Sequence, residues 1–268
     1  ATGPTGLHTS GQFGFSLLLV VCAMVSARSA AMIANRLLDR KIDGANPRTA
    51  GRALPSGRLS LGHATVAFLI CCALFLLVCL GFLWLQDNAW PIMLGIPVLL
   101  WICLYPLAKR FTFLCHAWLG ISLAMSPLAA ALAIAPDALL QQPAIWLLAG
   151  MVLAWVTGFD VLYALQDVQV DRSQGLHSMP STLGPTTAIW ISRLLHATAI
   201  VLLALVYVMD TRLHMIFLLS IAAAAAMLLW EHVLIARFGT DRITLAFFTL
   251  NGVVSCIIGT MGIIDLLQ

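Results

Sequence analysis

NRLLDRKID, at residues 35–43, is an acidic stretch at the end of a long apolar run, and it decides how the rest of the chain is interpreted. Its Asn35, Asp39 and Asp43 are spaced four residues apart, so on a helix they lie on one face. Neighbouring carboxylates disfavour an isolated helix but suit a divalent cation. Because charged side chains are costly in or near a bilayer, those found there are functional candidates.

A second acidic stretch, DVLYALQDVQVD, contains Asp160, Tyr163, Asp167 and Asp171. Its last two aspartates repeat the four-residue spacing of the first stretch. Carboxylate and amide oxygens suit Mg²⁺, which binds one or two carboxylates together with substrate phosphates. The two stretches therefore predict two metal-binding walls that face one another and hold a diphosphate between them.

The composition is that of a membrane protein. Of 268 residues, 61% are hydrophobic and 9% are charged, whereas soluble domains carry about a quarter charged residues. The seven cysteines show no metal-binding spacing, and we interpret them as buried thiols. The N-terminal segment lacks the basic and apolar regions of a signal peptide, and we interpret it as the remnant of a longer N-terminus.

Apolar runs of about 20 residues predict eight membrane spans. Their approximate limits are 12–38, 61–85, 90–107, 113–135, 143–165, 186–209, 213–236 and 243–266. The third is short, and its prolines predict a bend or a break. No long polar stretch separates the spans, so we expect an all-α, polytopic membrane bundle that forms a single domain over residues 1–268.

The positive charges predict the orientation of this bundle. Eleven of the 14 Lys and Arg residues fall on one face when the spans alternate, and both acidic stretches lie on that face. The positive-inside rule makes it cytoplasmic. The loop with Lys109 and Arg110 lies there too, and Arg28 is on the stripe of Asn35 but deeper. These residues predict a cytoplasmic mouth for the diphosphate, with an isoprenoid tail among the helices.

These residues resemble the UbiA superfamily of intramembrane prenyltransferases over essentially the whole chain. The resemblance rests on N-x-x-x-D-x-x-x-D at 35–43, on D-x-x-Y-x-x-x-D-x-x-x-D at 160–171, and on the loops NPRTAGRALPSGRLS (46–60) and YPLAKRFTFLCHAWLG (105–120). It implies a nine-helix bundle with a central cavity, of which the first helix is missing from this chain. It also implies Mg²⁺-dependent prenyl transfer.

The mechanism implied by the resemblance is ionisation of an allylic diphosphate followed by electrophilic aromatic substitution. The implied metal site consists of one amide and four carboxylates: Asn35, Asp39, Asp43, Asp167 and Asp171. The implied substrate contacts come from basic and aromatic side chains: Arg28, Tyr105, Lys109, Arg110 and Tyr163. Asp160 would orient or deprotonate the aromatic acceptor.

The acceptor itself stays open between two aromatic acids. The second motif resembles the branch of the family that serves respiratory quinone synthesis, where 4-hydroxybenzoate comes first and 1,4-dihydroxy-6-naphthoate of menaquinone synthesis second. Both carry a carboxylate, so an arginine contact is expected from Arg28 or Arg52. Beyond these substrates and the bilayer we expect no nucleic acid and no obligate protein partner.

Simpler interpretations exist for each feature. The first motif could be a solvated helix end with local ion pairs, Lys109 and Arg110 could only set topology, and Tyr105 could be an interfacial anchor. A membrane phosphotransferase would need one continuous acidic motif that is absent here. A cation-coupled transporter would place its acids near mid-membrane in broken helices.

Overall fold

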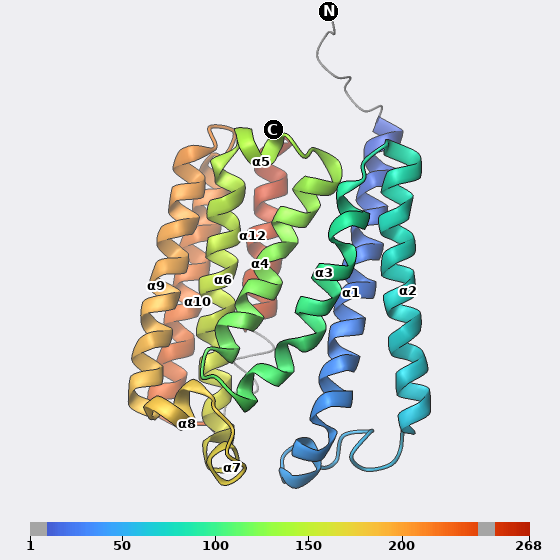
Figure 1. The fold of residues 1–268 in the computed structure, drawn as a ribbon. Helices are drawn as coiled ribbons and strands as arrows, with labels where there is room; N and C mark the ends of the chain where they lie inside the picture. The colour runs from blue at the N-terminus through green and yellow to red at the C-terminus, as the bar shows by residue number, and fades with distance from the viewer. Residues whose placement is uncertain (1–9, 241–249) are drawn as a thin grey trace, which may run out of the picture. The chain divides into compact units, whose positions relative to one another are not determined.

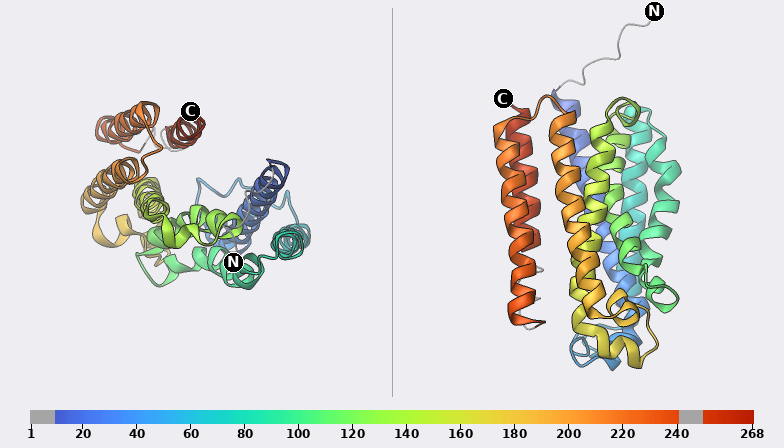
Figure 2. Two further views of the ribbon diagram at one scale, coloured as in Figure 1. Left: turned by 90° about the horizontal axis from the view of Figure 1, so that it is seen from above. Right: turned by 90° about the vertical axis from the view of Figure 1, so that its left-hand side faces the viewer.

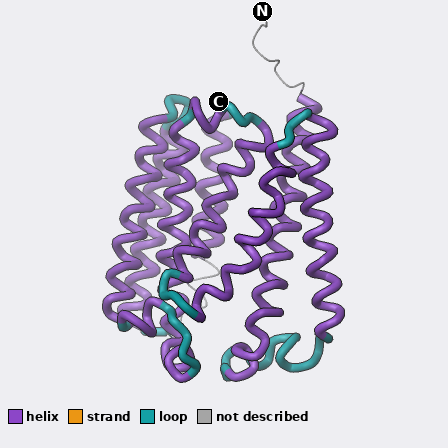
Figure 3. Tube along the Cα trace, viewed as in Figure 1, coloured by secondary structure: helices purple, strands orange, loops and turns teal. Residues whose placement is uncertain are grey.

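The computed structural model describes residues 10–240 and 250–268, and every regular element in these two ranges is a helix (Figure 3). In chain order the elements are α1 (Ser10–Ala45), α2 (Leu61–Gln86), α3 (Trp90–Leu104), η1 (Tyr105–Arg110), α4 (Cys115–Ile134), α5 (Ala138–Gln141), α6 (Pro143–Tyr163), η2 (Ala164–Asp167), α7 (Val168–Ser173), α8 (Met179–Leu183), α9 (Pro185–Met209), α10 (Met215–Phe238) and α12 (Asn251–Leu266) (Figure 1). The expected all-α architecture is confirmed.

Seven of the described helices are long and apolar enough to cross a membrane, one fewer than predicted. The eighth, α12, has 16 described residues, and residues 243–249 of the predicted span fall outside the described ranges. The third span is not broken at Pro97, because α3 continues through it and gives way to the 3-10 helix η1 at Tyr105. Pro106 follows directly, and a proline cannot donate the backbone hydrogen bond of a continuing α-helix.

The chain divides into two compact units. The first comprises Ala1–Pro106 and Ala129–Ala138, and the second comprises Leu107–Leu128 and Leu139–Gln268. Helix α4 therefore contributes its beginning to the second unit and its end to the first. That the whole chain forms a single domain stays a prediction.

In the first unit, α1, α2 and α3 pack against one another. Val20, Phe82 and Ala133 form a buried cluster that joins α1, α2 and the end of α4. Polar side chains reinforce this packing, since the amide of Gln86 donates to the Ser16 hydroxyl at 2.7 Å. The C-terminal end of α2 is thus held to α1 by both apolar and polar contacts.

In the second unit, α6 packs against α9, α9 against α10, and α10 against α12, as the view down the helices shows (Figure 2). Two glycines permit close approach. A Cβ at Gly120 of α4 would lie 2.8 Å from the Leu153 carbonyl oxygen of α6, and a Cβ at Gly158 of α6 would lie 2.6 Å from His196 Nε2 of α9. Small residues at helix crossings are the usual means of close packing in membranes.

Large apolar side chains remain exposed along all the long helices, among them Leu69, Trp84, Leu194 and Leu229. In a soluble protein such a surface would be an aggregation hazard. On helices of this length and hydropathy it is the surface that hydrocarbon chains contact. The chain is accordingly an integral, multi-pass membrane protein.

Candidate active site

The first acidic motif lies on the uninterrupted helix α1, so Asn35, Asp39 and Asp43 share one stripe as predicted. Asp39 is 3% exposed and Asp43 is 6% exposed. A solvated helix end would leave these carboxylates in water. Their burial instead requires compensating partners, because an isolated buried charge is strongly unfavourable.

The loop that follows α1 supplies partners for Asp43. The helix ends at Ala45 because Asn46 precedes a proline, a position that disfavours helical backbone. The Thr49 hydroxyl then donates to the Asp43 carbonyl oxygen at 2.9 Å. Arg52 Nη1 donates to Asp43 Oδ1 at 2.6 Å, and Arg36 Nη1 lies 3.7 Å from Asp43 Oδ2. The loop is therefore folded back onto the motif.

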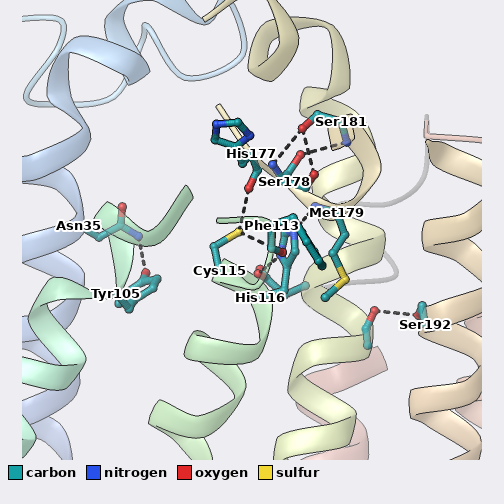
Figure 4. A network of polar contacts seen from close by, with 12 residues as sticks. Asn35, Tyr105, Phe113, Cys115, His116, His177, Ser178, Met179, Ser181 and Ser192 are labelled. Carbon is teal, nitrogen blue, oxygen red and sulfur yellow. Dashed lines mark hydrogen bonds and ion pairs between the residues drawn. The ribbon is translucent and has the colours of Figure 1, made fainter. Parts of the chain in front are cut away.

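Arg52 was predicted as a contact for the acceptor carboxylate, and in the structure its partner is Asp43. The other candidate for that contact, Arg28, is exposed on α1 and makes no hydrogen bond or ion pair with the described residues. Asn35 donates from Nδ2 to the hydroxyl of Tyr105, the first residue of η1 (Figure 4). The structure thus joins one predicted metal ligand to one predicted substrate contact within the first unit.

The second motif is built differently, because the helix changes type within it. Asp160 and Tyr163 lie in the last turn of α6, Asp167 ends the 3-10 segment η2, and Asp171 lies in α7. A 3-10 helix turns about 20° more per residue than an α-helix, so four such residues rotate the chain by about 80°. The 3-10 segment η2 therefore changes the register between Asp160 and the pair Asp167 and Asp171.

Tyr163 packs against the buried pair Leu162 and Ile235. Asp171 lies within electrostatic range of Asp167 and of Lys109, which belongs to the last turn of η1. The structure therefore brings the second carboxylate pair and the predicted phosphate-binding lysine together within one unit.

A short segment before α9 holds these parts in place. The backbone N–H of His177 donates to the Lys109 carbonyl oxygen at 2.6 Å, and Arg172 Nε donates to the Ser181 carbonyl oxygen at 3.0 Å. Ser178 and Ser181 form a capping box at the start of α8 (Figure 4). The segment thus connects η1 with α7.

His116 is a functional candidate that was not among the site residues predicted from the sequence. It lies in the first turn of α4, it is 4% exposed, and its Nδ1 is 2.7 Å from Asp160 Oδ2. The backbone N–H of Met179 donates to its Nε2 at 3.2 Å. A lone histidine and a lone aspartate in apolar helices each need a polar partner. That need was the available signal, but it did not say which residue the partner is.

The carboxylate pairs supply the oxygen donors expected of a magnesium site, but they do not form a complete set of protein ligands. Within residues 10–240 and 250–268, no group of three or more His, Cys, Asp or Glu side chains lies close enough to hold an ion. Asp43 Oδ2 is buried and has no hydrogen-bond partner among the described residues. Paired, oxygen-only donors suit Mg²⁺, which completes its shell with water and substrate phosphate.

Comparison with known proteins agrees with this architecture. The UbiA prenyltransferase family matches residues 2–253. A 4-hydroxybenzoate octaprenyltransferase of Tolumonas auensis is 32% identical over 250 residues, which cover 92% of this chain and 83% of that protein. The apo structure of a UbiA homolog from Aeropyrum pernix K1 is 31% identical, with a TM-score of 0.83 over 97% of this chain and 91% of that one.

A second solved structure supports the fold alone. The structure of a UbiA homolog from Archaeoglobus fulgidus, bound to DMAPP and Mg²⁺, has a TM-score of 0.67 at 17% identity over 94% of this chain and 88% of that one.

The family match and the 32% identical relative together identify this polytopic helical protein as a membrane enzyme of the prenyl-transfer class. The chain belongs to the UbiA prenyltransferase family. The predicted family and the predicted enzyme class, an aromatic prenyltransferase similar to 4-hydroxybenzoate polyprenyltransferases, are confirmed.

Proposed function

We propose that the protein transfers a polyprenyl group from an allylic diphosphate to 4-hydroxybenzoate, with Mg²⁺ as the required ion. The observation that carries this proposal is the buried pair Asp39 and Asp43 on one stripe of α1, with Arg52 folded back onto it. The 32% identical relative named 4-hydroxybenzoate octaprenyltransferase supports the choice of acceptor.

The metal would be held by oxygen donors from both motifs: Asn35, Asp39, Asp43, Asp167 and Asp171. When bound, Mg²⁺ neutralises charge on the leaving diphosphate. Magnesium bound together with DMAPP in the Archaeoglobus fulgidus homolog supports this part of the proposal. Each carboxylate pair suits one Mg²⁺, and we propose that both pairs would serve the same diphosphate.

The remaining groups bind and orient the substrates. Lys109 and Arg110, at the end of η1, donate to the diphosphate oxygens and stabilise the charge that develops as the allylic C–O bond breaks. Tyr105 and Tyr163 present aromatic rings, whose faces favour a neighbouring positive charge. The ring carbon of the acceptor then forms the new C–C bond, and the displaced ring proton leaves.

Asp160 orients the aromatic acceptor, and an arginine binds the carboxylate group of that acceptor. Because Arg52 already pairs with Asp43, the exposed Arg28 is the better candidate for the carboxylate. We further propose that the mouth of the site faces the cytoplasm, which the bias of Lys and Arg toward one face of the bundle supports.

The test is prenyl transfer in membranes that contain the protein, supplied with geranyl diphosphate and Mg²⁺. The acceptors 4-hydroxybenzoate and 1,4-dihydroxy-6-naphthoate are compared side by side, with EDTA as control. We expect an EDTA-sensitive product with 4-hydroxybenzoate. Product with the naphthoate alone would reassign the acceptor, and product that survives EDTA would contradict the metal requirement.

Asp39→Ala and Asp167→Ala should each abolish transfer. The matched control is Asp210→Ala, which removes an aspartate from the loop between α9 and α10, outside both motifs. Near-normal turnover of Asp167→Ala would show that the second pair does not bind the metal.

A further inference from the structure

His116 is a buried histidine outside both acidic motifs, and both of its ring nitrogens are engaged. Figure 4 shows its contact with Met179. One nitrogen faces the Asp160 carboxylate and the other faces the backbone N–H of Met179. The ring therefore joins three elements of the second unit: α4, α6 and α8.

The direction of both hydrogen bonds follows from chemistry. A backbone N–H can only donate, so Nε2 of His116 must accept from Met179. In a neutral imidazole the proton is then on Nδ1, which donates to Asp160 Oδ2 at 2.7 Å. The Met179 amide thereby selects the tautomer in which His116 is a donor to the carboxylate.

The two helices are close enough for this contact because of Gly120. It lies four residues after His116 on the same stripe of α4, and a Cβ there would be 2.8 Å from the Leu153 carbonyl oxygen of α6. His116 meets Asp160 near the end of α6, and Gly120 meets an earlier turn, so the two helices run antiparallel along this contact. The close packing fixes the distance between the histidine and the carboxylate.

The hydrogen bond between His116 and Met179 is also held in place at its Met179 end. Met179 is buried at the start of α8, and its side chain packs with Val161 and Ala188. The capping box of Ser178 and Ser181 orders the same turn. A donor held this firmly gives the imidazole a single orientation, which is what a preorganised site requires.

Asp160 retains one oxygen for a ligand. Its side chain is 23% exposed, whereas that of His116 is 5% exposed. Oδ2 is engaged by His116, and Oδ1 makes no hydrogen bond with the residues the structure describes. A carboxylate with one oxygen held and one available is suited to accept a hydrogen bond from a hydroxyl group.

We propose that His116 is a positioning residue that holds Asp160 so that Oδ1 accepts a hydrogen bond from the hydroxyl of the aromatic acceptor. This inference rests on the proposed function. Accepting that hydrogen bond increases electron density on the ring, which favours its attack on the allylic carbon. His116 touches neither substrate and acts only through Asp160.

Two substitutions test separately the two hydrogen bonds that the His116 imidazole makes, one with Asp160 and one with Met179. His116→Asn keeps a donor where Nδ1 stood, next to Asp160, and His116→Gln keeps a polar atom only where Nε2 stood, next to Met179. His196→Gln is the matched control, because His196 is buried like His116, at 3% against 4% exposed, but bonds to His232 in α10. For each variant in membranes, kcat and the KM values of both substrates are measured, together with the unfolding temperature in detergent.

We expect His116→Gln to lower kcat/KM for 4-hydroxybenzoate by about 10- to 100-fold, as a misoriented group does, with the diphosphate KM within about twofold. His116→Asn should retain more of the activity than His116→Gln, and His196→Gln should leave both KM values unchanged. Equal losses in the Asn and Gln variants, or parallel rises in both KM values, would overturn the proposal.

Binding of 4-hydroxybenzoate and benzoate, measured by calorimetry, gives a readout that does not need turnover. The unmodified protein should prefer the hydroxylated ligand, and His116→Gln should lose most of that preference. An unchanged preference would overturn the role of His116. Failure of the unmodified protein to transfer any prenyl group would instead overturn the proposed function, and it would be seen before any variant is made.

Discussion

The two acidic motifs share a four-residue spacing but differ in how the backbone presents it. In the first, Asp39 and Asp43 project from the regular helix α1 and are almost fully buried. In the second, Asp167 and Asp171 lie beyond a 3-10 segment and are partly exposed. Equal spacing in sequence therefore does not imply equal geometry.

The partners of the two motifs differ as well. The first is held by arginine side chains, with Arg52 2.6 Å from Asp43. The second has one close side-chain pair, His116 with Asp160 at 2.7 Å. The segment around it is fastened by bonds to backbone carbonyls: the His177 N–H donates to that of Lys109, and the Arg172 side chain donates to that of Ser181. Side-chain pairing fixes a charge, whereas backbone pairing fixes the shape of a loop. We infer that the first motif is preorganised before substrate binds and that the second depends on its surrounding segment.

The largest expected effect comes from removing a carboxylate from each motif. Asp39→Asn and Asp167→Asn should each reduce kcat/KM for the diphosphate by about 100-fold or more, as expected when a group that stabilises developing charge is removed. If the motifs act on one diphosphate, the double variant should be little worse than either single one, because residues that act as a unit are not additive.

Steady-state kinetics of the four proteins in this cycle provide the measurement, with Asp210→Asn as the control aspartate. Fully multiplicative losses in the double variant would mean that the two motifs act independently.

The next effect distinguishes two roles for Arg52. Arg52→Gln leaves the buried Asp43 without its closest cation, which we expect to cost about 1.5–3 kcal/mol of stability, since hydrogen bonds to charged groups contribute in that range. The KM of the diphosphate should rise while the KM of the aromatic acceptor stays constant. The opposite pattern would restore the predicted contact between Arg52 and the acceptor carboxylate.

Arg212→Gln is the matched control for Arg52→Gln. Arg212 also pairs with an aspartate at short distance, with Nη2 2.7 Å from Asp210 Oδ2, but its side chain is 60% exposed. Exposed pairs contribute about 0–1 kcal/mol, so unfolding temperature and both KM values should hardly change.

The sequence was sufficient to predict the features that depend on the local pattern of residues. The apolar runs predicted the long helices closely, and the spacing of Asn35, Asp39 and Asp43 predicted their common stripe, because α1 has no irregularity. It was insufficient for the pairing of His116 with Asp160, which are 44 positions apart in the chain. It also missed η2, since four residues of 3-10 helix leave no hydrophobic period to recognise.

A smaller effect is expected at Tyr105, which connects η1 to the first motif. Tyr105→Phe removes the hydroxyl that accepts from Asn35, and a lost hydrogen bond of about 1 kcal/mol corresponds to about a fivefold loss in kcat/KM. Tyr207→Phe is the control, because Tyr207 packs in the apolar core of the second unit. A Tyr105→Phe variant with full activity would show that the orientation of Asn35 does not depend on η1.

The smallest effect concerns the exposed pair that served as a control. Hydrogen bonds from the Arg212 guanidinium hold the pKa of Asp210 below its ordinary range. A lowered folded-state pKa stabilises the protein fully above the unfolded-state pKa of about 3.9, and the stabilisation is lost as pH falls through the folded-state value. Asp210→Asn should therefore lower the unfolding temperature by about 2 °C at most near pH 7.

That difference should begin to shrink as pH falls below about 4, where Asp210 of the unfolded chain becomes protonated, and it should vanish only below the lower folded-state pKa. Thermal unfolding of both proteins in detergent between pH 3 and pH 7 measures it. A difference of the same size at pH 3 as at pH 7 would mean that Asp210 stabilises the loop between α9 and α10 through its shape and not through its charge. The Asp–Arg pair would then be an unsuitable control for Asp43 and Arg52.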